Sequence, residues 1–176
     1  QDSGLRVLWA PRSPQRFQAV ANELRSKGIA VSLRSSLGRE MDAPIPQTRV
    51  LVGDSTGEMN AFYPVADLVF VGASLVDHGG HNIMEPLVLG RPVVMGPSTY
   101  GIDFAAEPAG QAGAFESLQD EFALEERIVE LLADPVALAK MSAASVAFAT
   151  DKTGAAEKTF LVLHSLLSPI TEGHSE

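Results

Sequence analysis

The residues best suited to chemistry gather in one short segment, Gly79-Gly80-His81-Asn82-Ile83-Met84-Glu85-Pro86. Two adjacent glycines let the backbone approach an anion closely, and a helix predicted to begin near Asn82 would turn its unpaired N–H groups toward the same point. Glu85 would lie in the first turn, where its carboxylate can accept hydrogen bonds from the vicinal hydroxyl groups of a ribose. His81 is a further candidate contact to phosphate. The segment therefore predicts a nucleotide site.

The same spacing also has a purely structural interpretation. Asn82 as an N-cap and Glu85 three residues later would form a capping box, in which each side chain bonds the other residue's backbone N–H. Because such caps are common, the spacing of this segment alone gives binding and capping about equal weight.

Three other polar segments follow short apolar runs that read as strands: Pro11-Arg12, Asp54-Ser55-Thr56-Gly57-Glu58 and Met95-Gly96-Pro97. Ligands of parallel α/β sheets bind beyond the carboxyl ends of the strands, so we expect these segments to meet at one edge. Arg12 could fork onto a phosphate, although a lone arginine is more often solvated. The turn before Glu58 could offer backbone groups to a base, or it could be an ordinary first turn of a helix.

Apolar runs alternate with amphipathic segments along the chain, as in a βα series. We predict strands over 5–10, 29–33, 49–52, 67–71, 92–95 and 114–115, helices over 15–27, 58–66, 82–89, 121–133, 135–149 and 155–167, and a loop from 96 to 113. This order predicts a single α/β domain over 1–176, with a Rossmann-like doubly wound parallel sheet covered on both faces.

Composition narrows the classes of partner. A net charge of -9 argues against nucleic acid, which requires a basic face. The chain has no Cys, and its four His have no metal-ligand spacing, so no metal site is expected. No Walker loop or Gly-x-Gly-x-x-Gly motif is present, and we expect no cofactor. No apolar run approaches the roughly 20 residues of a membrane-spanning helix.

Three ordered motifs resemble a known family. They are Ala10-Pro11-Arg12-Ser13-Pro14-Gln15-Arg16-Phe17, then Gly53-Asp54-Ser55-Thr56-Gly57-Glu58-Met59, then the series from Phe70 through Gly79-Gly80-His81-Asn82 to Pro97. They resemble the C-terminal domain of bacterial 3-deoxy-D-manno-octulosonic acid (Kdo) transferases. These are GT-B glycosyltransferases of lipopolysaccharide biosynthesis, which transfer Kdo from CMP-Kdo to a lipid A precursor. Ser13, Thr56 and Gly101 depart from the residues that the family often has at these places.

The resemblance implies a CMP-Kdo donor site built from three patches. The first patch would hold the donor at the end of the first strand, the second would lie near the base, and the third would put the helix start on phosphate and Glu85 on ribose. The residues are Pro11 and Arg12, then Thr56, Gly57 and Glu58, then Gly80, His81, Asn82, Ile83, Met84 and Glu85.

The resemblance also implies that other parts of the enzyme complete the reaction. The family's N-terminal domain carries the membrane anchor, the lipid A precursor site and the catalytic carboxylate, and places the enzyme at the cytoplasmic face of the inner membrane. We therefore expect this chain alone to be soluble, to bind CMP and to turn nothing over. The family's C-terminal domain usually opens with a further strand and helix, which should be central in the sheet. We expect the chain either to close that gap or to form a homodimer through it.

Two other functions fit the same architecture. One is a UDP-sugar-using glycosyltransferase of GT-B type or a UDP-sugar epimerase domain, although the sequence offers no convergent acid and base for an epimerase. The other is a non-catalytic nucleotide-binding module.

Overall fold

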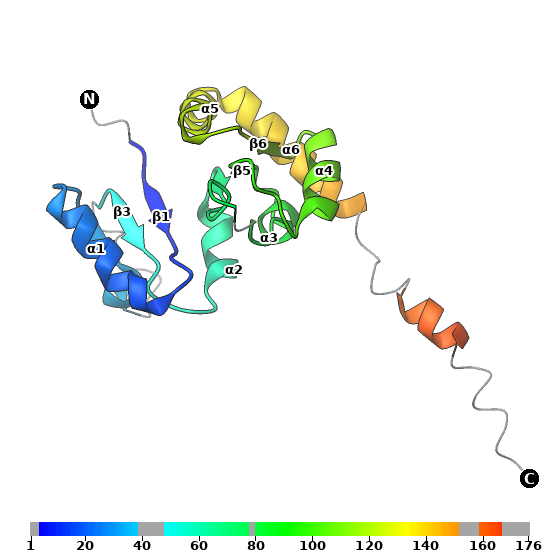
Figure 1. Ribbon diagram of the computed structural model, residues 1–176, viewed down its shortest axis with the longest axis horizontal. Coiled ribbons are helices and arrows are strands. Elements are labelled where there is room, and N and C mark those ends of the chain that lie inside the picture. Colours follow the sequence, from blue (N-terminus) through cyan, green and yellow to red (C-terminus); the bar gives the residue numbers. More distant parts are fainter. Residues whose placement is uncertain (1–3, 39–47, 78–79, 152–158, 167–176) are drawn as a thin grey trace, which may run out of the picture. The chain divides into compact units, whose positions relative to one another are not determined.

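The computed structural model of the chain describes residues 4–38, 48–77, 80–151 and 159–166. The chain divides into two compact units, Gln1–Ala66 and Asp67–Glu176, and each is built on its own three-stranded parallel sheet (Figure 1). The expectation of a single domain over 1–176 stays a prediction.

The first unit is a βα series around a central strand. Its strands β1 (Val7–Trp9), β2 (Val31–Leu33) and β3 (Val50–Val52) lie in the order β1-β3-β2. Helix α1 (Phe17–Ser26), preceded by the 3-10 turn η1 (Pro14–Arg16), packs Val20 and Ala21 against Val50 and Val52 of β3. The unit also holds the 3-10 turns η2 (Arg34–Leu37) and η3 (Tyr63–Val65) and the short helix α2 (Met59–Phe62).

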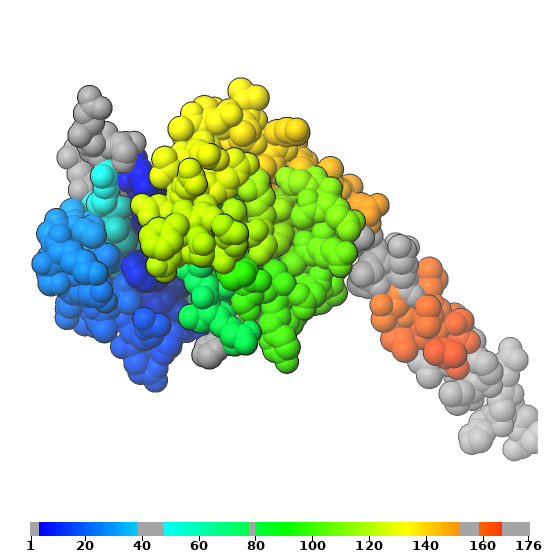
Figure 2. Space-filling model, turned by 45° about the horizontal axis from the view of Figure 1, so that its top comes forward, coloured from blue at the N-terminus to red at the C-terminus, as the bar shows by residue number. Residues whose placement is uncertain are grey.

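The second unit has the more complete core. Strands β4 (Val69–Phe70), β5 (Val93–Met95) and β6 (Phe115–Ser117) lie in this order. All three residues of β5 are fully buried, because both faces of this strand are covered. Val93 and Met95 pack with α3 (Met84–Val88), α4 (Asp103–Gln111) and Phe148, whereas Val94 packs with Leu124 of α5 (Glu121–Ala133) and Met141 of α6 (Pro135–Asp151). Figure 2 shows part of the outer surface that these helices form, in green and yellow.

The predicted loop over 96–113 is wrong, because it contains the helix α4. Pro108 and Gly110 favour a loop in the sequence, since neither is a good interior helix residue. Ile102, Ala105, Ala106 and Ala109 are nevertheless buried at helical spacing in the core of the second unit. Burial of this apolar stripe outweighs the two unfavourable residues.

Three other predicted helices differ at their bounds. Over 58–66 the chain forms α2 and then the turn η3, which contains Pro64. Helix α3 begins at Met84 and not at Asn82. Of the predicted helix over 155–167, residues 159–166 are helical, and the rest lies outside the described residues.

Each sheet ends in an edge strand with exposed apolar side chains. On and beside β1, Leu5, Val7 and Trp9 are 42%, 39% and 44% exposed, and on β4 Phe70 is 44% exposed. Neither strand has a hydrogen-bonded neighbour on its other side among the described residues. Parallel strands are normally buried, so such edges favour pairing with a further strand.

No single helix within the described ranges is long and apolar enough to cross a membrane. Helices α5 and α6 reach the necessary length and composition only together, and they are bent by 100° at their junction.

Candidate nucleotide-binding site

Asn82 organises the segment that carries most of the predicted site. Its Oδ1 accepts a hydrogen bond of 2.9 Å from the backbone N–H of Met84, and its Nδ2 donates one of 3.1 Å to Oε1 of Glu85. The predicted capping box is wrong in detail, because the N-cap of α3 is Ile83 and Glu85 bonds the side chain of Asn82 rather than its backbone N–H. The pair fixes the Glu85 carboxylate in one orientation.

Glu85 keeps capacity for a ligand. The side chain is exposed, and its Oε2 accepts no hydrogen bond from the described residues. A carboxylate oxygen has about two acceptor directions, so Oε2 can bond a hydroxyl group of a bound molecule. A helix of five residues has a small dipole, so the helix as a whole gives little support to the predicted phosphate contact.

At Gly80, the glycine is required for a different reason from the predicted positive φ. Gly80 does not adopt a positive φ, and a Cβ at this position would collide with the side chains of Met95 and Ile102. Gly80 therefore lies directly on the core of the second unit, where Ile83 is also fully buried. Gly79 lies outside the described residues. His81 is half-buried.

The other two predicted patches belong to the first unit. Pro11 and Arg12 follow β1, with Arg12 exposed, and Thr56, Gly57 and Glu58 follow β3. These strands are neighbours, and the backbone N–H of Gly53 donates to the carbonyl of Trp9 at 2.9 Å. The structure therefore brings the first and second patches to the same sheet edge. That the first and second patches join the third, which belongs to the second unit, stays a prediction.

Glu58 shapes the turn rather than presenting a free acid. Its Oε1 accepts a hydrogen bond of 3.2 Å from Arg34 Nη2, and its Oε2 accepts one from the hydroxyl of Ser55. Thr56 and Gly57, which lie between Ser55 and Glu58 in the turn, are exposed. Gly57 has a φ of 81°, a conformation that favours glycine. The groups open to a ligand are therefore the backbone N–H and C=O groups at the tip of the turn.

Asp54 lies in one of the predicted strand-end segments, whereas sequence reasoning missed Arg34 and Ser35. The carboxylate of Asp54 accepts hydrogen bonds from the backbone N–H of Ser35 at 2.7 Å and from its hydroxyl at 2.5 Å. Arg34 also donates to the carbonyl of Gly38 at 2.9 Å. These contacts tie η2 to the loop after β3. The signal was present, because Arg34 and Ser35 directly follow a predicted strand.

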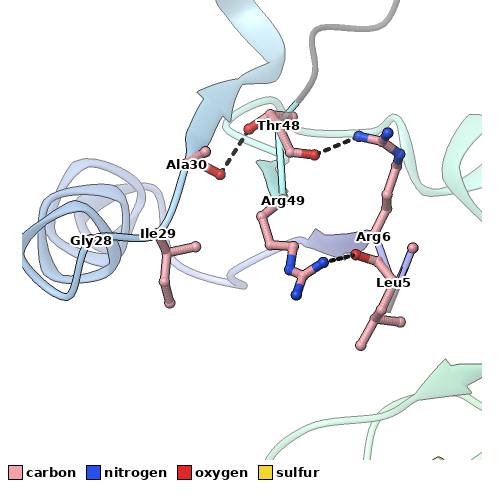
Figure 3. Close-up of a pocket in the computed structure, with 8 residues that line it drawn as sticks. Leu5, Arg6, Gly28, Ile29, Ala30, Thr48 and Arg49 are labelled. Atoms are coloured by element: carbon pink, nitrogen blue, oxygen red, sulfur yellow. Dashed lines mark hydrogen bonds between the residues drawn. The ribbon is translucent and has the colours of Figure 1, made fainter. Parts of the chain in front are cut away.

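A cavity of about 460 Å³ lies at the opposite, amino-terminal end of the first sheet (Figure 3). Arg6 and Arg49 line it, and Arg6 donates to the carbonyl of Thr48 at 2.9 Å. It contains none of the predicted site residues. The described part of the chain holds no cluster of three His, Asp or Glu side chains that could bind a metal ion.

Comparisons with known proteins give close relatives, although no family model matches the chain. The chain is 37% identical over 161 residues to the 3-deoxy-D-manno-octulosonic acid transferase of Bordetella pertussis, which is 92% of this chain and 37% of that protein. It is 42% identical over 96 residues to the transferase of the same name from Haemophilus influenzae, or 54% of this chain and 22% of that protein. The chain thus spans less than two fifths of the length of either of these curated relatives.

Two solved structures are similar. One is the C-terminal CMP-Kdo binding domain of WaaA from Acinetobacter baumannii, with a TM-score of 0.73 and 30% identity, covering 84% of this chain and 75% of that one. The other is HepE from Anabaena in complex with UDP, with a TM-score of 0.55 and 15% identity, covering 93% of this chain and 49% of that one. The second likeness concerns the fold alone. Together they confirm the predicted α/β fold class.

Proposed function

The chain belongs to the family of 3-deoxy-D-manno-octulosonic acid transferases, and we propose that it is the donor-binding domain of such a glycosyltransferase, with CMP-Kdo as its donor. The observation that carries the proposal is the likeness to the CMP-Kdo binding domain of WaaA over 84% of this chain. Its support from the structure is the Asn82–Glu85 pair, which leaves one carboxylate oxygen open beside a loop of backbone N–H groups.

In the proposed mechanism the domain holds the leaving group of the reaction. When the bond between Kdo and phosphate breaks, negative charge grows on the phosphate of CMP. Backbone N–H groups of the loop from Gly80 to Ile83, together with Arg12, stabilise that charge. Because Asn82 already orients Glu85, the carboxylate can accept a ribose hydroxyl on Oε2 without first losing side-chain freedom.

The base is assigned to the turn of the first unit. Cytosine has both donors and acceptors on its edge, and the tip at Thr56 and Gly57 offers both kinds of backbone group. Glu58 acts through this turn, because each of its two oxygens already accepts a hydrogen bond, one from Arg34 and one from Ser55. The proposal thus moves Glu58 from ligand contact to support of the turn.

The acceptor side is assigned to the part of the relatives that this chain does not span. We propose that a lipid A precursor and the catalytic carboxylate belong there, and that the parent enzyme works at the cytoplasmic face of the inner membrane. This chain alone then binds CMP and transfers nothing. Joined to the part of a relative that this chain does not span, the chain should transfer Kdo, and complete inactivity of that joined protein would favour a non-catalytic module.

We further propose that two copies of this chain associate through β1. The strand is at an edge, its side chains Val7 and Trp9 are exposed, and it holds no charged residue, although Arg6 directly precedes it. Light scattering should give a dimer for this chain and a monomer for Trp9→Lys. A monodisperse monomer of the unchanged chain would contradict this association while leaving the donor site untouched.

Calorimetric titration with CMP, UMP and UDP tests the donor directly. The proposal expects CMP to bind most tightly. Tighter binding of UDP would contradict the Kdo transferase assignment and favour a UDP-sugar-using enzyme of the same fold.

A further inference from the structure

A fully buried serine joins two loops of the second unit. The hydroxyl of Ser74 donates to the carbonyl of Val71 at 2.8 Å and accepts from the backbone N–H of Gly96 at 2.8 Å. The backbone carbonyl of Ser74 accepts a further hydrogen bond of 3.0 Å from Ser98. One residue therefore links the loop that follows β4 to the loop that follows β5.

The two loops are also in direct backbone contact. A Cβ at Gly96 would lie 2.6 Å from the carbonyl oxygen of Ser74 and 2.8 Å from the backbone nitrogen of Leu75. Ala73, next to the serine, has a φ of 67°, which is unfavourable for any residue with a Cβ. This strained backbone persists because the surrounding contacts fix it, and the bonds of Ser74 are the nearest of them.

The third strand of the sheet takes part in the same arrangement. The hydroxyl of Ser117, the last residue of β6, donates to the carbonyl of Gly96 at 3.0 Å. Both backbone polar groups of Gly96 are thus bonded by serine hydroxyls. Through this glycine, the carboxyl ends of all three strands are connected.

The connection leads to the segment 80–85. Met95 directly precedes Gly96, is fully buried, and is the residue on which Gly80 packs. Ile83 lies in the same core cluster as Met95. A shift of Gly96 therefore moves the surface on which Gly80, Asn82 and Glu85 are held.

We infer that Ser74 is a positioning residue of the donor site: its hydroxyl fixes Gly96 and Met95, and these fix the loop that contacts the nucleotide. The identity of the ligand, CMP, rests on the proposed function, whereas the contacts of Ser74 and Gly96 do not depend on it. Removal of the hydroxyl leaves the buried N–H of Gly96 without an acceptor and takes one hydrogen bond from the carbonyl of Val71. This loss favours a rearrangement of both loops.

The chain offers a matched control in Ser145. It is also fully buried in the second unit, and its hydroxyl donates to the carbonyl of Met141 at 2.9 Å within α6. Ser145→Ala removes the same atom from an equally buried site, but it breaks no bond between loops. Ser145→Ala thus controls for the loss of a buried hydroxyl as such, and a positioning effect should appear only in Ser74→Ala.

Two measurements on the 176-residue chain test the inference. In CMP titrations, Ser74→Ala should bind about tenfold more weakly than the unchanged chain, and Ser145→Ala within about twofold of it. In hydrogen exchange without nucleotide, the amides of 80–85 should exchange faster in Ser74→Ala and at the unchanged rate in Ser145→Ala.

The outcomes separate the inference from the proposed function. If the unchanged chain binds no CMP, the proposed function fails, and the exchange rates still decide the role of Ser74. If Ser74→Ala loses stability but keeps both its CMP affinity and its exchange rates in 80–85, Ser74 is only structural and the inference is overturned. Should Ser74→Ala not fold, Ser74→Cys keeps a similar size with weaker hydrogen bonds. It should then give intermediate affinity and exchange, and unchanged values for both would overturn the inference equally.

Discussion

The two units hold their carboxyl-terminal strand ends in opposite ways. In the first unit, charged side chains near the surface tie the ends of β2 and β3: Arg34 to Glu58, with side chains 26% and 33% exposed, and Ser35 to Asp54. In the second unit, the fully buried hydroxyl of Ser74 and the backbone of Gly96 tie the ends of β4 and β5.

This difference has a thermodynamic consequence. Exposed ion pairs contribute little to stability and exchange readily with water, whereas a buried polar contact is costly to break. We therefore expect the second unit to provide the rigid part of the proposed donor site and the first unit the adaptable part. Four predictions test this contrast.

The largest difference between the units should appear when one glycine of each is replaced by alanine. Gly96→Ala places a methyl group against backbone atoms that cannot move separately, and should cost about 3 kcal/mol in the free energy of unfolding. Gly57→Ala meets no atom within 4 Å, and its positive φ should cost only about 1 kcal/mol. Urea unfolding of both variants measures the difference. Equal losses would show that the two units are equally tolerant.

The next effect concerns binding rather than stability. Glu85→Ala should weaken CMP binding by about thirtyfold, because a charged acceptor for ribose is lost, while the unfolding temperature changes little. Glu125→Ala removes an exposed carboxylate from α5 and serves as the control for the change in charge. If Glu85→Ala lowers the unfolding temperature and leaves CMP affinity unchanged, Glu85 only stabilises the start of α3 and the binding interpretation of this segment is wrong.

A smaller effect is expected at the surface pair of the first unit. Arg34→Met removes the ion pair to Glu58 and should cost about 1 kcal/mol of stability. It should also weaken CMP binding a few-fold, because the turn at Thr56 and Gly57 loses its support. Arg25→Met on α1 is the matched control for loss of a guanidinium. Identical CMP affinities for the two variants would show that Arg34 does not support nucleotide binding.

The smallest effect should be at a surface pair of the second unit. Arg127 of α5 forms two hydrogen bonds with Glu116 of β6, at 2.7 and 2.9 Å, and one with Glu130. These bonds raise the pKa of Arg127, so its guanidinium stays charged wherever the chain is folded. Because the side chain is 32% exposed, Arg127→Met should cost at most about 1 kcal/mol, less at high salt, without changing CMP affinity. A loss of affinity in thermal-shift titrations would contradict this.

Much of the fold could be predicted from local pattern. The apolar run at Val93–Met95 and the helix over 121–133 are found where the sequence places them, because burial and helical periodicity are strong signals. The helix α4 could not be predicted in this way, since Pro108 and Gly110 hide an alanine-rich stripe whose burial depends on the rest of the core.

The site was predicted less completely. The segment at Asn82 and Glu85 carries a visible spacing, and the two side chains are indeed bonded to each other. Arg34 and Ser74 were missed, because their partners lie 24 and 22 residues away and depend on how the strands are ordered. The three patches follow from the family resemblance. Contacts in space add that both oxygens of Glu58 accept hydrogen bonds, whereas only Oε1 of Glu85 does so among the described residues.

The most direct test of the central claim is an amide NMR titration of the chain with CMP. We predict that the signals of residues 80–85 and of 56–58 shift together with one midpoint, while those of Ile29, Ala30 and Arg49 at the opposite end of the first sheet stay in place. Shifts confined to the residues that line that opposite cavity, or two separate midpoints for the two segments, would contradict a single donor site built on these loops.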